Sequence, residues 1–189
     1  MNVYLLDTDT DNYQWFAPKN KDGWSLIDSL GDTSVPNLWA KVEMNLSGRK
    51  LLIGDFPYLA SDIPVFSQRA IDTLNDLLVP NGELLPLVCP GYSYSAFNVT
   101  SILDVLDEDL SDIIYFNSSK KVMDIEKYMF RPEKLTGAVI FKIPQFYRSY
   151  VFVTDIFVKR VQEAGLTGFK FPLLWSDEPP QTTVEKDES

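Results

Sequence analysis

Three aspartates, at positions 7, 9 and 11, directly follow the apolar run Val3–Leu6. Carboxylates at such close spacing are the oxygen ligands that hard divalent cations prefer, and they can also act as nucleophiles or general acids. A second candidate, Gly54-Asp55, ends the apolar run "LLI". The same patterns are typical of solvated acidic turns after strands, so both interpretations remain open for these aspartates.

Other common catalytic groups are missing or poorly placed. The sequence has no histidine, which excludes Ser-His-Asp triads, Cys-His dyads and His-ligated zinc. Its one cysteine, Cys89, follows an apolar strand in "PLVCPGY", a context that predicts a buried, unreactive thiol. Neither GxGxxG nor GxxxxGK[ST] occurs, which removes the usual nucleotide-binding loops.

The segment "VYLLDTDT" resembles the first motif of haloacid-dehalogenase-type phosphohydrolases. The resemblance implies that Asp7 is a nucleophile and Asp9 an acid/base, with magnesium between them. The segment "LLIGDF…SD" (51–62) is similar to the late Gly-Asp metal motif of that family. Only about 40 residues separate the two motifs, too few for the βα units that a doubly wound sheet needs between them. A magnesium-dependent phosphohydrolase is therefore kept as the alternative function.

The composition indicates a folded protein without a nucleic-acid or membrane partner. Of 189 residues, 45% are hydrophobic and 13% aromatic, enough for a large core. Seventeen basic and twenty-seven acidic residues give a net charge of 17 − 27 = −10, which repels phosphate backbones and attracts basic proteins. No apolar run reaches the roughly 18 residues of a membrane helix. The N-terminus lacks the pattern of a secretory signal and a single cysteine allows no intrachain disulfide, so we expect a cytoplasmic protein.

Hydrophobic spacing predicts an α+β fold, with a mixed, largely antiparallel sheet and two or three packed helices. Helical spacing is present in residues 66–78, 101–112 and 155–164. Strands are expected at 3–6, 49–56, 83–88, 113–116, 137–143 and 150–153, while 122–130 is ambiguous and 13–41 is expected to form short strands and loops. We expect one domain over 1–175, less defined over 1–50, and a disordered acidic tail over 176–189.

The best-defined unit is "DIFVKRVQEAGLTGFKFPLLW", residues 155–175. Asp155 is placed to cap a helix, and Gly165 to end it in the left-handed conformation, with Leu166 folded back onto the last turn. Phe157 and Val161 belong to one buried stripe. Phe169 and Phe171 are expected on one face of a following strand, with Phe169 buried.

Two groups of residues are candidates for binding a partner. In the predicted helix 101–112, four carboxylates form an acidic ridge that could mimic phosphates: Asp104, Asp107, Glu108 and Asp112. In the N-terminal region, four aromatic residues could form an apolar centre: Trp15, Phe16, Trp24 and Trp39. A solvated polar face and a set of core aromatics are the ordinary alternatives for these groups.

The order of elements resembles a family of bacterial immunity proteins, the myxobacterial-type immunity domains. The resemblance rests on "FSQRAIDTLNDLLVPNGELLPL", "YSAFNVTSILDVLDED" and "AVIFKIP…YVFVTDIFVKRVQEAGLTGFKFPLLW", within residues 50–175. These motifs are structural, and no catalytic site comes with them.

The resemblance implies a cytosolic antitoxin, neither an enzyme nor dependent on a cofactor or metal. Its partner would be the cognate toxin of a polymorphic or secretion-delivered system, such as type VI secretion. A positive nuclease would suit the net charge best. An adaptor unrelated to toxins is a third hypothesis, which the neighbouring gene would decide.

Overall fold

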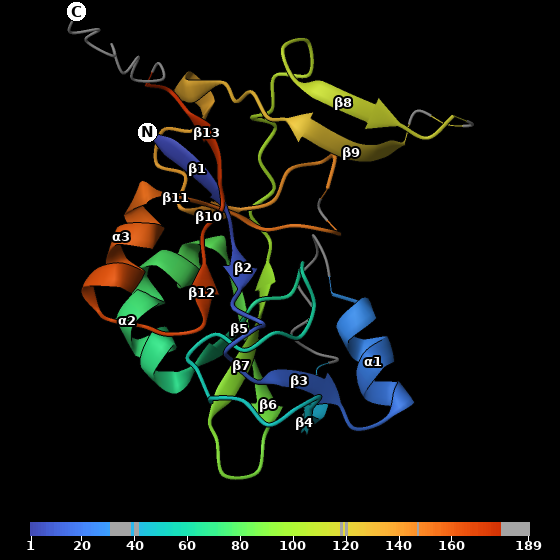
Figure 1. Ribbon diagram of the computed structural model, residues 1–189, viewed down its shortest axis with the longest axis vertical. Coiled ribbons are helices and arrows are strands. Elements are labelled where there is room, and N and C mark those ends of the chain that lie inside the picture. Colours follow the sequence, from blue (N-terminus) through green and yellow to red (C-terminus); the bar gives the residue numbers. More distant parts are fainter. Residues whose placement is uncertain (31–38, 40–41, 118, 120, 147, 179–189) are drawn as a thin grey trace, which may run out of the picture.

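A computed structural model of the chain describes residues 1–30, 39, 42–117, 119, 121–146 and 148–178 (Figure 1). Within these residues three α-helices pack with mixed, largely antiparallel sheets, which confirms the predicted α+β class. No helix among the described residues is long and apolar enough to cross a membrane. Of the predicted tail, 179–189 lie outside the described residues. Ser176 ends a strand, and Asp177 pairs with the amino group of Met1.

The first strand of the chain lies inside a sheet that is otherwise built from its last third. An antiparallel four-stranded sheet has the order β10 (Ile140–Phe141), β11 (Phe152–Thr154), β1 (Asn2–Leu5) and β13 (Leu173–Ser176). The chain continues from β1 into β2 (Asp7–Thr8), which pairs with β12 (Phe169–Lys170). Both early strands therefore have their hydrogen-bonding partners in the C-terminal part of the chain.

A five-stranded sheet occupies the other half of the molecule (Figure 1). Its order is β3 (Trp15–Pro18), β4 (Val42–Ser47), β6 (Gly82–Val88), β7 (Tyr94–Val99) and β5 (Val65–Ser67). All its pairs are antiparallel except β4 with β6. Helix α1 (Lys21–Asp28) packs beside β3 and β4.

Helices α2 (Gln68–Leu78) and α3 (Asp155–Glu163) lie side by side and share a hydrophobic cluster with one face of the four-stranded sheet (Figure 1). Ser67 caps α2 by accepting the amide of Ala70, and a 3₁₀ turn, η1 (Val79–Asn81), follows the helix. The predicted apolar stripe of α2 is buried, as are Phe157 and Val161 of α3. Phe169, which was expected to be buried, is only half-buried, and it stacks on Phe56 with ring centroids 4.4 Å apart.

The four-stranded sheet separates two hydrophobic clusters because its side chains alternate between faces. Val153 and Ile140 face α2 and α3, whereas Val3 and Phe152 face the segments on the other side. That second cluster supports a hairpin of β8 (Asp112–Tyr115) and β9 (Val122–Lys127), through side chains that include Ile125. The 3₁₀ turn η2 (Pro132–Lys134) follows, and the hairpin projects from this end of the molecule (Figure 1).

The expected end of helix α3 is confirmed. Gly165 has φ +59°, and two hydrogen bonds join the amides of Gly165 and Leu166 to the carbonyls of Gln162 and Val161. This pair of bonds is the Schellman motif, and Leu166 is buried behind it as predicted.

The expected role of Asp155 as a helix cap is wrong. Thr154 holds the cap position, and the Asp155 carboxylate accepts hydrogen bonds from the backbone and side-chain amides of Asn2 and from the Tyr4 hydroxyl. Burial alone would raise the pKa of Asp155, but these hydrogen bonds outweigh it and lower the pKa below its ordinary value. Asp155 therefore fixes β1 to the start of α3.

The predicted helix over 101–112 does not exist, so its acidic residues do not form a helical ridge. The segment is extended: Ile102 bridges Lys142 in parallel, and Leu106 bridges Phe130. Its backbone finds partners in neighbouring segments, such as Met129, which accepts the amide of Asp107. Apolar residues at this spacing fit either a helix with one buried face or an extended segment that is covered on both sides. Leu110 distinguishes the two, because the helix would bury it, whereas it is 61% exposed.

Two further local predictions are wrong. Residues 49–56 form no strand, because Gly54 lies against the Tyr13 ring and only Leu52 makes a single bridge, to Tyr13. Residues 21–28, expected as loop or strand, form α1, which begins where the Asn20 side chain accepts the amide of Gly23. Gly23 lowers helix propensity, yet it lets α1 approach Pro18 closely.

We expect Gly165→Val to lower the free energy of unfolding by about 1–2 kcal/mol, because a β-branched residue is strained in the left-handed region. No atom lies within 4 Å of a Cβ added at Gly165, so the loss reflects backbone strain rather than a clash. Gly165→Asn is the matched control, since asparagine tolerates this conformation. Urea unfolding measures all three proteins, and equal stability of the valine variant and the wild type would contradict the assignment.

Candidate functional site

The aspartates that suggested metal chemistry are bound by groups of this chain. Asp9 accepts a hydrogen bond from the Asn12 side chain and lies 3.2 Å from the Lys170 ammonium. The Asn12 hydrogen bond is the main reason that the pKa of Asp9 is lowered, and Lys170 adds to it. Asp7 accepts the amide of Thr8, within the two-residue strand that pairs with β12. Among the described residues, no group of three or more His, Cys, Asp or Glu side chains is arranged to hold a metal ion.

Asp55, the other aspartate of that hypothesis, joins three parts of the fold. Its carboxylate accepts hydrogen bonds from the Ser67 hydroxyl, from Arg69 Nη1 at 2.9 Å, and from the backbone amide of Thr167 at 2.9 Å. Arg69 also donates to the carbonyl of Ala164 at the end of α3. With a side chain only 10% exposed and these donors around it, Asp55 has a structural role.

Cys89 is buried, as the sequence predicted. Burial raises the pKa of its thiol to about 11, so the reactive thiolate is scarce near neutral pH. This thiol is not a candidate nucleophile.

The N-terminal aromatic residues do not form one exposed surface. Trp15 and Trp24 are about two-fifths exposed, at 41% and 40%, whereas Trp39 is half-buried and donates its indole N–H to the carbonyl of Pro86. The expectation that Phe16 is exposed is wrong: it is 3% exposed and packs edge-to-face on Tyr94. Side chains alternate along β3, so Trp15 points outward where Phe16 points into the core.

The acidic candidates lie beside the hairpin, in two different electrostatic states. The carboxylate of Asp104 lies 3.2 Å from Lys134 and that of Asp107 3.7 Å from Arg131, so both are neutralised locally. Asp107 also accepts two amides of its own turn. Glu108 and Asp112 are exposed and have no cation partner in the part of the chain that the structure describes.

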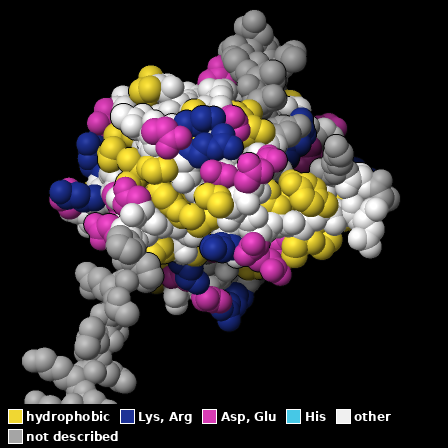
Figure 2. All heavy atoms as spheres, turned by 90° about the horizontal axis from the view of Figure 1, so that it is seen from above, with side chains coloured by type: hydrophobic (Ala, Val, Ile, Leu, Met, Phe, Trp, Pro, Cys, Tyr) yellow, Lys and Arg dark blue, Asp and Glu magenta, His cyan; other side chains and the backbone are white. Residues whose placement is uncertain are grey.

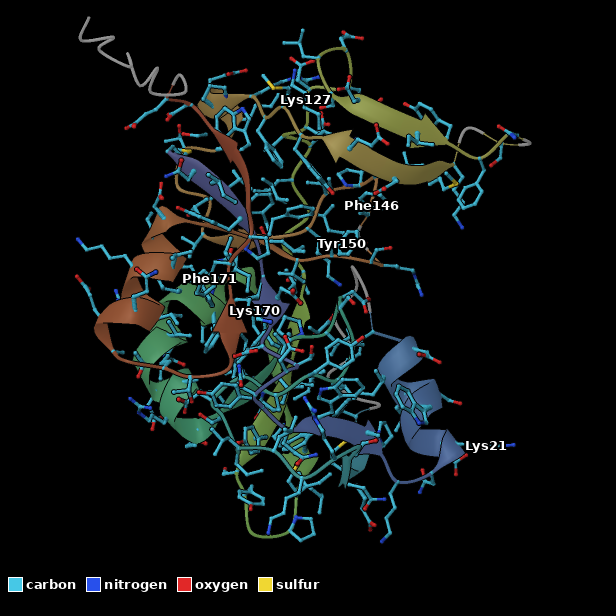
Figure 3. The ribbon with its side chains drawn as sticks, viewed as in Figure 1. Lys21, Lys127, Phe146, Tyr150, Lys170 and Phe171 are labelled. Atoms are coloured by element: carbon cyan, nitrogen blue, oxygen red, sulfur yellow. The ribbon has the colours of Figure 1, made fainter. Side chains whose placement is uncertain are left out.

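The two predicted groups lie at opposite ends of the molecule. Figure 3 marks this separation with Lys21, at the start of α1, and Lys127, at the end of β9. Trp15 and Trp24 belong to the first end, and the four carboxylates to the second (Figure 1). A partner of ordinary size that binds one group would not use the other as its centre.

The hairpin end carries exposed apolar residues that the sequence analysis did not select. Leu110, Tyr115, Phe116 and Met123 are between 43% and 61% exposed. Figure 2, which views the molecule from this end, shows hydrophobic side chains gathered among acidic and basic ones. Predicting this surface would have required knowing that 122–127 is a strand and 101–111 an extended segment.

Five exposed carboxylates accompany those apolar side chains, without an ion-pair partner among the described residues. They are Glu108, Asp109, Asp112, Asp124 and Glu126. These five, with Leu110, Tyr115, Phe116 and Met123, are called the hairpin surface below. Apolar side chains with charged groups around them are the usual anatomy of a protein-binding surface.

A groove of about 790 Å³ opens beside the hairpin surface. Glu108 and Gln145 lie on one of its walls, and their side chains are joined by a hydrogen bond from Gln145 Nε2 to Glu108. The described residues that line it are Glu108, Tyr115, Ser119, Lys121, Val122, Pro144 and Gln145. The groove is partly polar and has room for a segment of a partner protein.

The family model described as "Immunity protein family (Imm11)" matches residues 88–173. The match runs from the end of β6 through the hairpin and α3 to the start of β13. It supports the assignment of this chain to an immunity protein family, as the resemblance in the sequence indicated, and with it an antitoxin role and a cognate toxin as the partner. A comparison with curated proteins found no match.

We expect Asp55→Ala to lower the free energy of unfolding by about 3 kcal/mol, because it leaves the Thr167 amide and Arg69 without their acceptor. Asp76→Ala is the control: it removes an ion pair with Arg160 in which the Asp76 side chain is 63% exposed, and should cost less than about 1 kcal/mol. Urea unfolding measures both variants. Similar losses in the two would show that Asp55 is not the structural centre described above.

Proposed function

We propose that this immunity protein is a cytoplasmic, non-catalytic inhibitor of a basic toxin, most simply a nuclease, and that it covers the toxin's active site with the hairpin surface. The observation that carries the proposal is a set of five exposed carboxylates without ion-pair partners among the described residues, in the same stretch of chain, 108–126, as four exposed apolar side chains. A nuclease needs a positive groove to hold a phosphate backbone, and that groove would be complementary to such a surface.

Net charge and local charge act at different stages of this association. The net charge of −10 attracts a basic partner from a distance and raises the association rate. Affinity then depends on desolvated contacts near the centre of the interface, for which Tyr115, Phe116 and Met123 are the side chains available. A surface of this kind needs no reacting group, since it inhibits by occupying the partner's groove.

The N-terminal end of the molecule is the competing location. Trp15 and Trp24 are exposed there, and Asp22 and Asp28 of α1 are exposed carboxylates. The hairpin surface is favoured on charge, because it has five exposed carboxylates without an ion-pair partner among the described residues, against two on α1. Exposed apolar side chains do not separate the two ends, since Leu46, Leu52 and Tyr92 are also exposed near β3. The two ends can be separated by moving the same amount of charge on each.

We expect Asp109→Lys combined with Glu126→Lys to slow association with the toxin encoded by the neighbouring gene at least tenfold at low salt, and to flatten its salt dependence. Among the described residues, neither side chain makes a hydrogen bond or an ion pair that the fold would lose. The measurement is the association rate against ionic strength, with the melting temperature as the check on folding.

Asp22→Lys combined with Asp28→Lys is the matched control, because it makes the same change in net charge, −10 + 4 = −6, on α1. A small effect of this pair supports the hairpin surface. Equal slowing by both pairs would show that only the net charge of the protein matters, and not the position of the carboxylates. A larger effect of the α1 pair would indicate that the toxin binds at the N-terminal end.

A further inference from the structure

We propose that the groove between the hairpin and Pro144–Gln145 receives an arginine side chain of the toxin, bound by Glu108 and Gln145. This inference rests on the proposed function, because it names the contact by which that surface would hold a basic partner. It is argued from the unused hydrogen-bonding capacity of two side chains in the groove wall.

Glu108 differs from its acidic neighbours in what it contacts. Asp104 and Asp107 each lie near a cation, Lys134 or Arg131, whereas the described partner of Glu108 is the neutral amide of Gln145. No cation among the described residues therefore offsets this carboxylate at the edge of the groove. One of its oxygens accepts from Gln145 Nε2, and the other has no donor among the described residues, so it can accept from a partner.

Gln145 supplies a second acceptor. Its Oε1 atom is buried and has no hydrogen-bond donor in the described part of the chain. A buried acceptor without a donor costs about 1–3 kcal/mol, which a donor from outside would recover. Since Oε1 is covered in the unbound protein, the side chains that line the groove would have to shift when that donor enters.

Two acceptors on one wall favour arginine over lysine. A guanidinium group carries five N–H donors in a planar fork, so it can serve the Glu108 carboxylate and Gln145 Oε1 at once. Tyr115 lines the same groove, and its ring offers a surface on which a guanidinium can stack.

One charge in the groove opposes a cation. Lys121 also lines it, and the structure has no ion pair between Lys121 and Glu108. The groove therefore has a negative and a positive part, and the arginine belongs on the Glu108 side. A partner segment with an acidic residue near that arginine would match both parts, which gives the site specificity as well as affinity.

The first test uses a probe that does not depend on the toxin. N-acetyl-arginine amide is titrated into the ¹⁵N-labelled protein, with N-acetyl-citrulline amide as the uncharged equivalent. We expect the arginine probe alone to shift the amide signals of Glu108, Tyr115 and Gln145, and Glu108→Gln to weaken its binding at least fivefold. Shifts that are absent, equal with citrulline, or confined to other residues would overturn the proposal.

The second test uses the toxin encoded by the neighbouring gene. Glu108→Gln should raise its dissociation rate at least tenfold, because the arginine loses its charged acceptor. Glu133→Gln is the matched control, an exposed carboxylate in η2 outside the groove lining, and should have little effect. Unchanged dissociation in Glu108→Gln would overturn the groove contact.

The two proposals fail in different ways. If the wild type binds the toxin and the Asp109→Lys, Glu126→Lys pair slows association while Glu108→Gln changes nothing, the groove is wrong and the hairpin surface stands. If the wild type does not bind the toxin, the proposed function fails, and the arginine titration still decides whether the groove binds a guanidinium.

Discussion

The carboxylate of Asp55 is the contact on which the helical half of the fold depends. It lies where three segments meet: the loop after Gly54, the start of α2 and the turn that follows α3. The backbone amides of Asp55 and Phe56 donate to the carbonyl of Thr167, so the loop and the turn are also joined directly. Gly168 next to this turn approaches the backbone of Phe56 so closely that a Cβ would lie 2.8 Å from its carbonyl oxygen. The turn after α3 is therefore held against the backbone of Phe56 by both hydrogen bonds and close packing.

This arrangement positions the hairpin end of the molecule through the four-stranded sheet. The turn that Asp55 holds leads into β12 and β13, which pair with β2 and β1 at the start of the chain. Asp155 fixes β1 from the other side through Asn2. The sheet fixed in this way carries Val3 and Phe152 on the face that supports the hairpin. A projecting hairpin on a rigid sheet suits a protein that binds a partner without changing shape.

The sequence predicted best those elements whose signals were local. Helix α2 and the end of α3 were recognised because apolar spacing and the Gly165 signal both act within a few residues. The immunity family was indicated by the order of such elements. Asp155 was misread because its carboxylate could equally cap a helix or bind a distant strand, and only the pairing of β1 with β11 decides between them. Residues near Asp155 in the sequence carry no signal for its contact with Asn2, which is 153 positions away.

The residue types of the proposed site could be read from the sequence, but their positions in the fold could not. Negative charge and exposed aromatic residues were expected, and Glu108 and Asp112 do lie on the hairpin surface. The apolar part was missed because Tyr115, Phe116 and Met123 are exposed only when 112–127 forms a hairpin that touches the core on one face. Phe16 was misassigned for a similar reason, since alternation along β3 and not residue type determines which aromatic side chain is exposed.

Amide hydrogen exchange of the chain, alone and bound to the toxin encoded by the neighbouring gene, tests the central claim most directly, because it reports the covered surface without any substitution. The account predicts slower exchange in β8, in β9 and at Gln145 and Phe146 on binding, with α1 and β3 unchanged. Slower exchange confined to α1, β3 and the loop after Gly48, with the hairpin unaffected, would contradict it.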